Sequence, residues 1–136
     1  MIHVLIVDDH HHMRRNVRRL LQQEPDIRVV DEASNGREGV ELAEAHNPDV
    51  IVMDIAMPDM DGFQAIEQIQ KLGIPAKIVI LSMYANLTFV QRALQQGVKG
   101  YVLKRTAVRE LALAIKTAWQ GRLYLSPTLA DTLSDS

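Results

Sequence analysis

Short runs of apolar residues recur along this chain, and they limit its possible folds more than any other feature. The runs occupy residues 2–7, 27–30, 50–53, 78–81 and 101–103. They are rich in Val and Ile and almost unbroken by polar residues, which is typical of strands buried on both faces of a parallel sheet. The sequence therefore predicts five parallel strands.

Segments with helical spacing separate these runs. Their apolar faces comprise Met13, Val17, Leu20 and Leu21 in the first segment, Phe63, Ile66 and Ile69 in another, and Val108, Leu111, Ala112, Ile115 and Trp119 in the last. Parallel neighbours need crossover connections, and helices supply them. We therefore expect an α/β fold, a doubly wound parallel sheet in which a strand–helix unit repeats five times, with strand order 2-1-3-4-5.

Two pairs of polar residues have the spacing of a capping box, in which two side chains satisfy free amides at a helix start. They are Asn35 with Glu38 and Asp61 with Gln64. We expect helices to begin at both places.

The chain of 136 residues has the length of one domain. Gly121 ends the last helical segment, and the tail after it is polar, contains Pro127 and has weak periodicity. We therefore expect a folded domain over residues 1–121 and a linker or frayed terminus over residues 122–136.

Composition excludes several classes of protein. The chain has no cysteine, so it has no disulfide framework, zinc ribbon, iron–sulfur ligation or cysteine nucleophile. Its 15 Lys and Arg against 17 Asp and Glu give a net charge of −2, which offers no electrostatic basis for general nucleic-acid or membrane binding. No apolar stretch approaches the ~18–20 residues of a membrane span, and the first run leads directly into acidic residues. We expect a cytoplasmic protein that does not bind membranes.

Carboxylates follow two of the predicted strands. Asp8 and Asp9 come after the first apolar run and Asp54 after the third. In the expected strand order these strands are neighbours, and ligands bind at the carboxyl ends of such strands. Two like charges about 4 Å apart repel by roughly 4 kcal/mol at an effective dielectric constant of ~20, so the cluster needs a cation or a raised pKa. Oxygen ligands of this kind favour Mg²⁺.

A hydroxyl and an ammonium group follow the last two runs. Ser82 comes after the fourth run and Lys104 after the fifth. Each residue alone is typical of a turn or a surface, but beside metal-bound carboxylates they supply two contacts for an anion. Together with the acids they indicate a site for a phosphoryl group.

These residues resemble the motifs of a known family. Asp8-Asp9, the string at 54–62 (DIAMPDMDG), Ser82 and the string at 100–104 (GYVLK) resemble the receiver domain of two-component response regulators, a flavodoxin-like fold, over residues 2–120. The resemblance implies that Asp54 is the phosphoacceptor.

The same resemblance implies the roles of the other residues. Asp9, Asp54 and the Ala56 carbonyl would bind Mg²⁺, with Asp8 supporting the ion through water. Ser82 and Lys104 would contact the phosphoryl oxygens.

The resemblance also implies a partner and a switch. A phosphohistidine of a sensor histidine kinase would be the donor, so the domain is a signalling domain and not an independent enzyme. Tyr101 would be the switch aromatic, outward without phosphate and inward with it, responding to movement of Ser82.

The later part of the chain resembles the NarL/FixJ subfamily with its LuxR-type output. The resemblance rests on residues 87–101, on Thr106 and on residues 121–127. It implies transcription control through a helix-turn-helix domain after this chain, DNA binding only through that domain, and a possible homodimer. The alternatives are a stand-alone receiver acting on other proteins, an unphosphorylated binding scaffold, or a Mg²⁺-dependent phosphatase with an aspartyl-phosphate intermediate.

Two local features allow more than one interpretation. Residues 10–12 are all histidine, and three consecutive helical residues point apart and cannot all reach one ion. We expect surface packing there, with His10 able to modulate the acidic pocket. The first helix also carries basic residues that form either a solvated face or a docking surface, namely Arg14, Arg15, Arg18 and Arg19.

One residue departs from the commonest receiver pattern. Arg105 follows Lys104, where many receivers have proline after a cis bond. The sequence leaves the isomer of this bond open.

Overall fold

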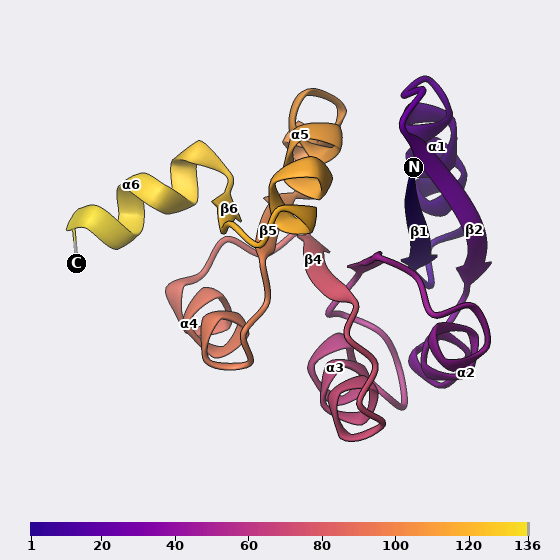
Figure 1. The fold of residues 1–136 in the computed structure, drawn as a ribbon. Coiled ribbons are helices and arrows are strands. Elements are labelled where there is room, and N and C mark those ends of the chain that lie inside the picture. The colour runs from indigo at the N-terminus through magenta and orange to yellow at the C-terminus, as the bar shows by residue number, and fades with distance from the viewer. Residues whose placement is uncertain (136) are drawn as a thin grey trace.

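The computed structural model describes residues 1–135, which form one parallel sheet with helices on both faces (Figure 1). The strand order is β2-β1-β3-β4-β5-β6, and every neighbouring pair is parallel. The strands are β1 (Ile2–Val7), β2 (Ile27–Ala33), β3 (Val50–Met53), β4 (Lys77–Ser82), β5 (Gly100–Leu103) and β6 (Tyr124–Leu125). The predicted order of the first five strands is confirmed.

Helices cover the sheet in two groups. They are α1 (His11–Gln22), α2 (Gly36–His46), α3 (Gly62–Lys71), α4 (Leu87–Gln95), α5 (Ala107–Trp119) and α6 (Pro127–Asp135). Figure 1 shows α1 and α5 on one face, with α2, α3 and α4 on the other. The two groups enclose two separate apolar cores.

The strand β1 shows why its sequence lacks alternation. Val4 and Ile6 pack in the core beneath α1 and α5, whereas Leu5 and Val7 pack in the core beneath α2 and α3. Successive side chains of a strand point to opposite faces of the sheet, and here helices bury both faces. The unbroken apolar run therefore reflects burial on two sides.

Both predicted helix starts are present. Asp61 and Gln64 form a complete capping box at the start of α3. At α2 the side chain of Asn35 accepts from the backbone N–H of Glu38, while the Glu38 carboxylate accepts from the N–H of Ser34. These caps place the starts of α2 and α3 at the same edge of the sheet as the carboxyl ends of the strands.

The chain after Gly121 differs from the expected linker. It forms β6, which adds to the sheet beside β5, and then α6. Leu129 of α6 is only 1% exposed and belongs to the same core as Val90 and Ala93 of α4. A strand of two residues and a single fully buried leucine leave too short a pattern for prediction. Residue 136, the end of the predicted tail, lies outside the described residues.

None of the helices within residues 1–135 combines the length and apolar character that a bilayer-spanning segment requires.

Candidate functional site

The carboxyl ends of β1 and β3 bring two buried acids side by side. Val7 pairs with Met53 in the sheet, so the next residue of each strand, Asp8 and Asp54, lies at the same level. The N–H of Asp54 donates to the carbonyl of Val7 at 2.9 Å. Each of the two aspartates is only 2% exposed. The backbone of the sheet therefore holds two carboxylates together away from water.

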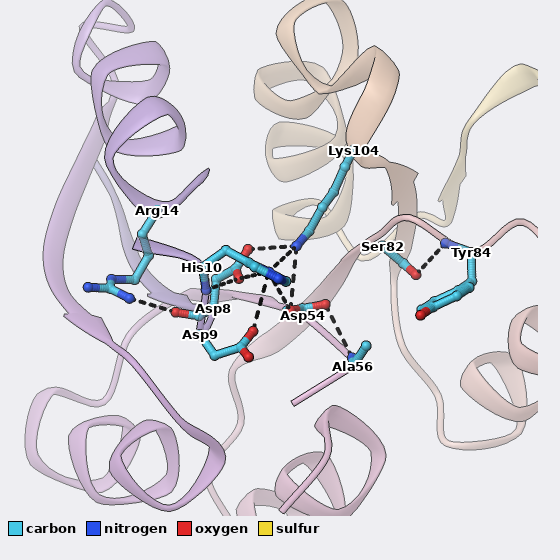
Figure 2. A network of polar contacts seen from close by, with 9 residues as sticks. All are labelled: Asp8, Asp9, His10, Arg14, Asp54, Ala56, Ser82, Tyr84 and Lys104. Atoms are coloured by element: carbon cyan, nitrogen blue, oxygen red, sulfur yellow. Dashed lines mark hydrogen bonds and ion pairs between the residues drawn. The ribbon is translucent and has the colours of Figure 1, made fainter. Parts of the chain in front are cut away.

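Lys104 bridges these two carboxylates. Its Nζ lies 3.0 Å from Asp8 Oδ2 and 3.4 Å from Asp54 Oδ2, and its side chain is 6% exposed. It follows β5, separated from β1 by two strands, and reaches across the strand ends to the acids (Figure 2). A buried ammonium between two carboxylates compensates part of their charge.

Asp54 has a strongly perturbed acidity. Burial, and then the charge of Asp8, raise the pKa of Asp54 from 3.8 to about 7, while Lys104 and the N–H of Ala56 act in the opposite direction. That N–H donates to Asp54 Oδ1 at 3.2 Å. Asp54 Oδ2 is buried and has no hydrogen-bond donor, so its only described partners are the ion pairs. A group with this pKa is only partly ionised at neutral pH, and a nearby cation would favour its charged form.

His10 completes the cluster, although sequence analysis predicted only a modulating role for it. Its Nδ1 lies 3.2 Å from Asp8 Oδ1, 3.3 Å from Asp9 Oδ1 and 3.7 Å from Asp54 Oδ2. One ligand atom from each of these four residues lies within 4.8 Å of all the others. The helix α1 begins at His11, and His10 precedes it in an extended conformation.

The expectation that three consecutive helical histidines point apart therefore does not apply to His10. Its position directly after two adjacent acids is the signal that could have identified it.

Ser82 and Tyr101 form a separate polar link next to the cluster. The Ser82 hydroxyl accepts from the N–H of Tyr84 at 2.9 Å, and the Tyr101 hydroxyl donates to the carbonyl of Tyr84 at 2.7 Å. Burial raises the pKa of Tyr101, and a hydrogen bond with Ser82 opposes this shift. Figure 2 shows Ser82 paired with Tyr84, whereas Lys104 points into the acids. Tyr101 is inward and fully buried, and the predicted exchange between two positions stays a prediction.

The arginines of α1 divide into two kinds. Arg14 donates through Nη1 to the carbonyl of Asp8 at 2.8 Å, and Arg18 lies 2.6 Å from the carboxylate of Glu32 on β2. Arg15 and Arg19 are exposed. Part of the predicted basic face is therefore structural, since Arg14 supports the strand end that carries Asp8.

The surface beside Lys104 is hollowed. A depression of about 370 Å³ is lined by Met13, Ser82, Met83, Leu103, Lys104 and Arg105. Lys104 begins a 3₁₀ turn over Lys104–Thr106, and no peptide bond within residues 1–135 is cis. The depression leaves space for a small anion on the side of the cluster where Ser82 and Lys104 lie.

Comparison with known proteins identifies relatives along almost the whole chain. The family model of the response regulator receiver domain matches residues 4–116. The nitrate/nitrite response regulator protein NarL of Escherichia coli strain K12 is 38% identical over 133 residues, which are 98% of this chain and 62% of NarL. The transcriptional regulatory protein LiaR of Bacillus subtilis strain 168 is 39% identical over 130 residues, which are 96% of this chain and 62% of LiaR.

A solved structure agrees with the fold. A LuxR-family two-component response regulator from Aurantimonas sp. SI85-9A1 superposes with a TM-score of 0.94 at 32% identity, covering 99% of this chain and 96% of that one. The chain spans 62% of the length of both curated relatives. The family match, the strand order and these relatives agree, and we conclude that this chain belongs to the response regulator receiver domain family and is of the NarL/LuxR type.

Proposed function

We propose that Asp54 accepts a phosphoryl group from a phosphohistidine of a sensor histidine kinase. The observation that carries this proposal is the buried carboxylate oxygen Asp54 Oδ2, which has no hydrogen-bond donor and lies 3.4 Å from the ammonium of Lys104. A carboxylate held in this way is a nucleophile whose surroundings already compensate negative charge. Asp8 and Asp9, whose carboxylates lie in the same cluster, are assigned to cation binding.

The residues present fit a divalent cation. We assign Asp9, Asp54 and the carbonyl of Ala56 as its ligands, with Asp8 supporting it through water. Their hard oxygen atoms are the ligands that Mg²⁺ prefers, and the charge of three neighbouring carboxylates calls for a cation. When bound, the ion neutralises the charge that develops on the transferred phosphoryl group.

The transfer needs positioning more than covalent chemistry. A carboxylate oxygen of Asp54 attacks the phosphorus in line, and the bond between phosphorus and the donor imidazole nitrogen breaks with its electron pair left on that nitrogen. Lys104 lies where its ammonium can contact a phosphoryl oxygen. Ser82 borders the same depression, and its O–H can donate to a phosphoryl oxygen as a second contact, since its oxygen only accepts from the N–H of Tyr84.

The acceptor is tested with acetyl phosphate and Mg²⁺ followed by intact mass measurement. We expect the mass of one added phosphoryl group, none in Asp54→Asn, and none in excess EDTA. Asp59→Asn is the matched control, because Asp59 is exposed, lies five residues later, and has a φ of 66° that asparagine also tolerates. Full labelling of Asp54→Asn would assign the acceptor elsewhere.

A phosphatase with an aspartyl-phosphate intermediate is the alternative in another class. It uses similar residues, but its nucleophile lies in an Asp-x-Asp motif after the first strand. Here the acids after β1 are adjacent, and the best acceptor follows β3. Sustained turnover of p-nitrophenyl phosphate would support the alternative, and a single stoichiometric labelling supports the acceptor.

The output we propose is control of transcription by the full-length protein. The names of NarL and LiaR support this proposal, since one is a nitrate/nitrite response regulator and the other a transcriptional regulatory protein. In our proposal DNA contact is made by a helix-turn-helix domain beyond this receiver, the protein acts in the cytoplasm, and phosphorylation favours a homodimer. The test is DNA binding by the full-length protein, which acetyl phosphate should tighten in the parent and not in Asp54→Asn. A stand-alone receiver would show no DNA binding in either form.

A further inference from the structure

We propose that His10 is a nitrogen ligand of the acidic pocket, so that the pocket binds a first-row transition ion such as Co²⁺ or Zn²⁺ through His10 as well as Mg²⁺ through its oxygens. The inference rests on the cation site of the proposed function. It adds a ligand and a second class of metal to that site.

The distances around His10 suit a common ion. Ligands about 2.1 Å from one ion stand roughly 3.0 to 3.4 Å apart in octahedral or tetrahedral geometry. His10 Nδ1 lies 3.2 Å from Asp8 Oδ1 and 3.3 Å from Asp9 Oδ1, with Asp54 Oδ2 slightly farther at 3.7 Å. Two of these three distances already match ligand separation, and all four ligand atoms lie within 4.8 Å of one another.

The buried oxygens point independently to a missing partner. Asp54 Oδ2 and Asp8 Oδ2 belong to side chains that are only 2% and 3% exposed, and neither oxygen has a hydrogen-bond donor. Lys104 supplies one positive charge for both of them. A divalent cation at the junction of these carboxylates would supply the remaining charge.

The surroundings of His10 Nδ1 offer several carboxylate oxygens at once, of which Asp8 Oδ1 lies within hydrogen-bond distance. Three carboxylates face this atom, and the ammonium of Lys104 lies 3.4 Å from it. An N–H at Nδ1 would suit the carboxylates but would face the ammonium, whereas a lone pair would suit the ammonium but would face the carboxylates. A metal ion accepts the lone pair and the carboxylate oxygens together. Imidazole suits Zn²⁺, Co²⁺ and Ni²⁺, whereas carboxylate and carbonyl oxygens suit Mg²⁺.

His10 can be substituted with little effect on the rest of the fold. Its side chain is 55% exposed and forms no capping hydrogen bond with α1, so its removal leaves the core and the helix start intact. His12 is the matched control, because it is an exposed histidine two residues away and lies outside the cluster.

The experiment measures Co²⁺ and Mg²⁺ binding to the 136-residue chain by calorimetry, together with the visible absorption of bound Co²⁺. In His10→Ala we expect Co²⁺ affinity to fall at least about tenfold, as the loss of a ligating group predicts, with a much smaller change in Mg²⁺ affinity. The Co²⁺ absorption should also change in shape, because a nitrogen ligand is lost. His12→Ala should bind Co²⁺ as the parent does.

Two results would overturn the inference. One is equal Co²⁺ affinity and absorption in His10→Ala and the parent, and the other is an equal loss in His12→Ala, which would mean adventitious binding to surface imidazoles. Phosphorylation of the parent protein in Mg²⁺ distinguishes failure of this inference from failure of the proposed function. If Asp54 is still labelled in Mg²⁺ but Co²⁺ affinity does not depend on His10, only the inference fails. If the parent is not labelled and binds no Mg²⁺, the proposed function fails.

Discussion

The carboxylate of Asp54 is held at a cost to the stability of the fold. Its pKa is raised from 3.8 to about 7, mainly by burial, so the folded state binds a proton that the unfolded state has released. The contribution of Asp54 to the stability of the metal-free protein should therefore fall as pH rises from about 4 to about 7, by as much as about 4 kcal/mol.

Asp54→Asn removes this ionisation, so the variant should be more stable than the parent in EDTA. The difference should be small near pH 4, should widen up to pH 7 and should then level off. Urea unfolding at several pH values measures it, with Asp59→Asn as the control. A constant difference between Asp54→Asn and the parent at pH 5 and pH 8 would mean that Asp54 ionises normally.

Gly62 positions the loop that follows the acceptor. A Cβ at Gly62 would collide with the carbonyl oxygen of Asp54 and would lie 2.7 Å from the Cα of Ile55. Gly73 is a useful contrast, because it has a φ of 72° but nothing within 4 Å of an added Cβ. There the cost of alanine is conformational only, about 1–2 kcal/mol.

We therefore expect Gly62→Ala to cost more than Gly73→Ala, about 3 kcal/mol, because the loop must move. Gly62→Ala should also slow phosphorylation of Asp54. Urea unfolding and the labelling rate measure the two effects. Equal unfolding free energies and equal labelling would show that the loop adjusts freely.

The residues of the site differed in how well the sequence predicted them. Asp8, Asp54 and Lys104 were predictable because each directly follows a buried strand, and the sheet then places them together. His10 was not, because a helical assignment turns it away from the acids, and only the backbone at the start of α1 determines where it points. The position of the Ser82 hydroxyl depends on a hydrogen bond that it accepts from the N–H of Tyr84, and no sequence pattern indicates such a bond.

At the scale of elements, β6 is attached to α5 by a partly buried polar pair. The Tyr124 hydroxyl donates to Glu110 Oε1 at 2.9 Å, and Glu110 is only 7% exposed. Burial, and then Glu110, raise the pKa of Tyr124 to about 12. Tyr124→Phe leaves the carboxylate without this donor, so we expect a loss of about 1–3 kcal/mol.

The pH dependence gives a second measure of the same pair. A raised tyrosine pKa means that the folded parent keeps a proton that the unfolded chain releases, so this residue lowers stability as pH rises from about 10 to about 12. The stability of Tyr124→Phe should not show this decline between about pH 10 and pH 12. Thermal unfolding across this range detects it, and an unchanged profile would mean that the hydroxyl titrates normally.

The elements themselves were predictable where side-chain burial forms them. The first five strands and their order follow from apolar runs buried on two faces. The short β6 joins the sheet through backbone hydrogen bonds, since the N–H of Tyr124 donates to the carbonyl of Lys99 and that of Ser126 to the carbonyl of Tyr101, and its two side chains are only partly buried. Backbone hydrogen bonds leave no periodic signal in the side chains, and for this reason the tail resembled a linker.

At the scale of the whole molecule, a chain of polar contacts leads from the site to the tail. Ser82 accepts from the N–H of Tyr84, whose carbonyl accepts from the Tyr101 hydroxyl. The carbonyl of Tyr101 in turn accepts from the N–H of Ser126 at 3.0 Å, and the Ser126 hydroxyl accepts from the N–H of Leu103. Movement of Ser82 can therefore change β5 and the start of α6.

Phosphorylation supplies the charge that would drive such a movement. It replaces the Asp54 carboxyl group, which carries at most one negative charge, with a group nearer −2 that has three acceptor oxygens. The Ser82 hydroxyl accepts from the N–H of Tyr84, and its own O–H can donate to a phosphoryl oxygen and draw the side chain away from Tyr84. To reverse a 1:99 population, the group must favour the active state by about 5.5 kcal/mol, which a few charge-assisted hydrogen bonds in a partly buried site can supply.

We therefore predict that a phosphate mimic with Mg²⁺ shifts the amide NMR signals of residues 82–105 and of residues 124–126. Ser82→Ala should still be phosphorylated, because the nucleophile and Lys104 remain, but should lose most of the response in the tail. Ser34→Ala is the matched control, since Ser34 is an exposed serine that follows β2 at the same edge of the sheet. Identical tail shifts in Ser82→Ala and the parent would show that the signal does not pass through Ser82, and the loop over residues 55–61 would then be the coupling element.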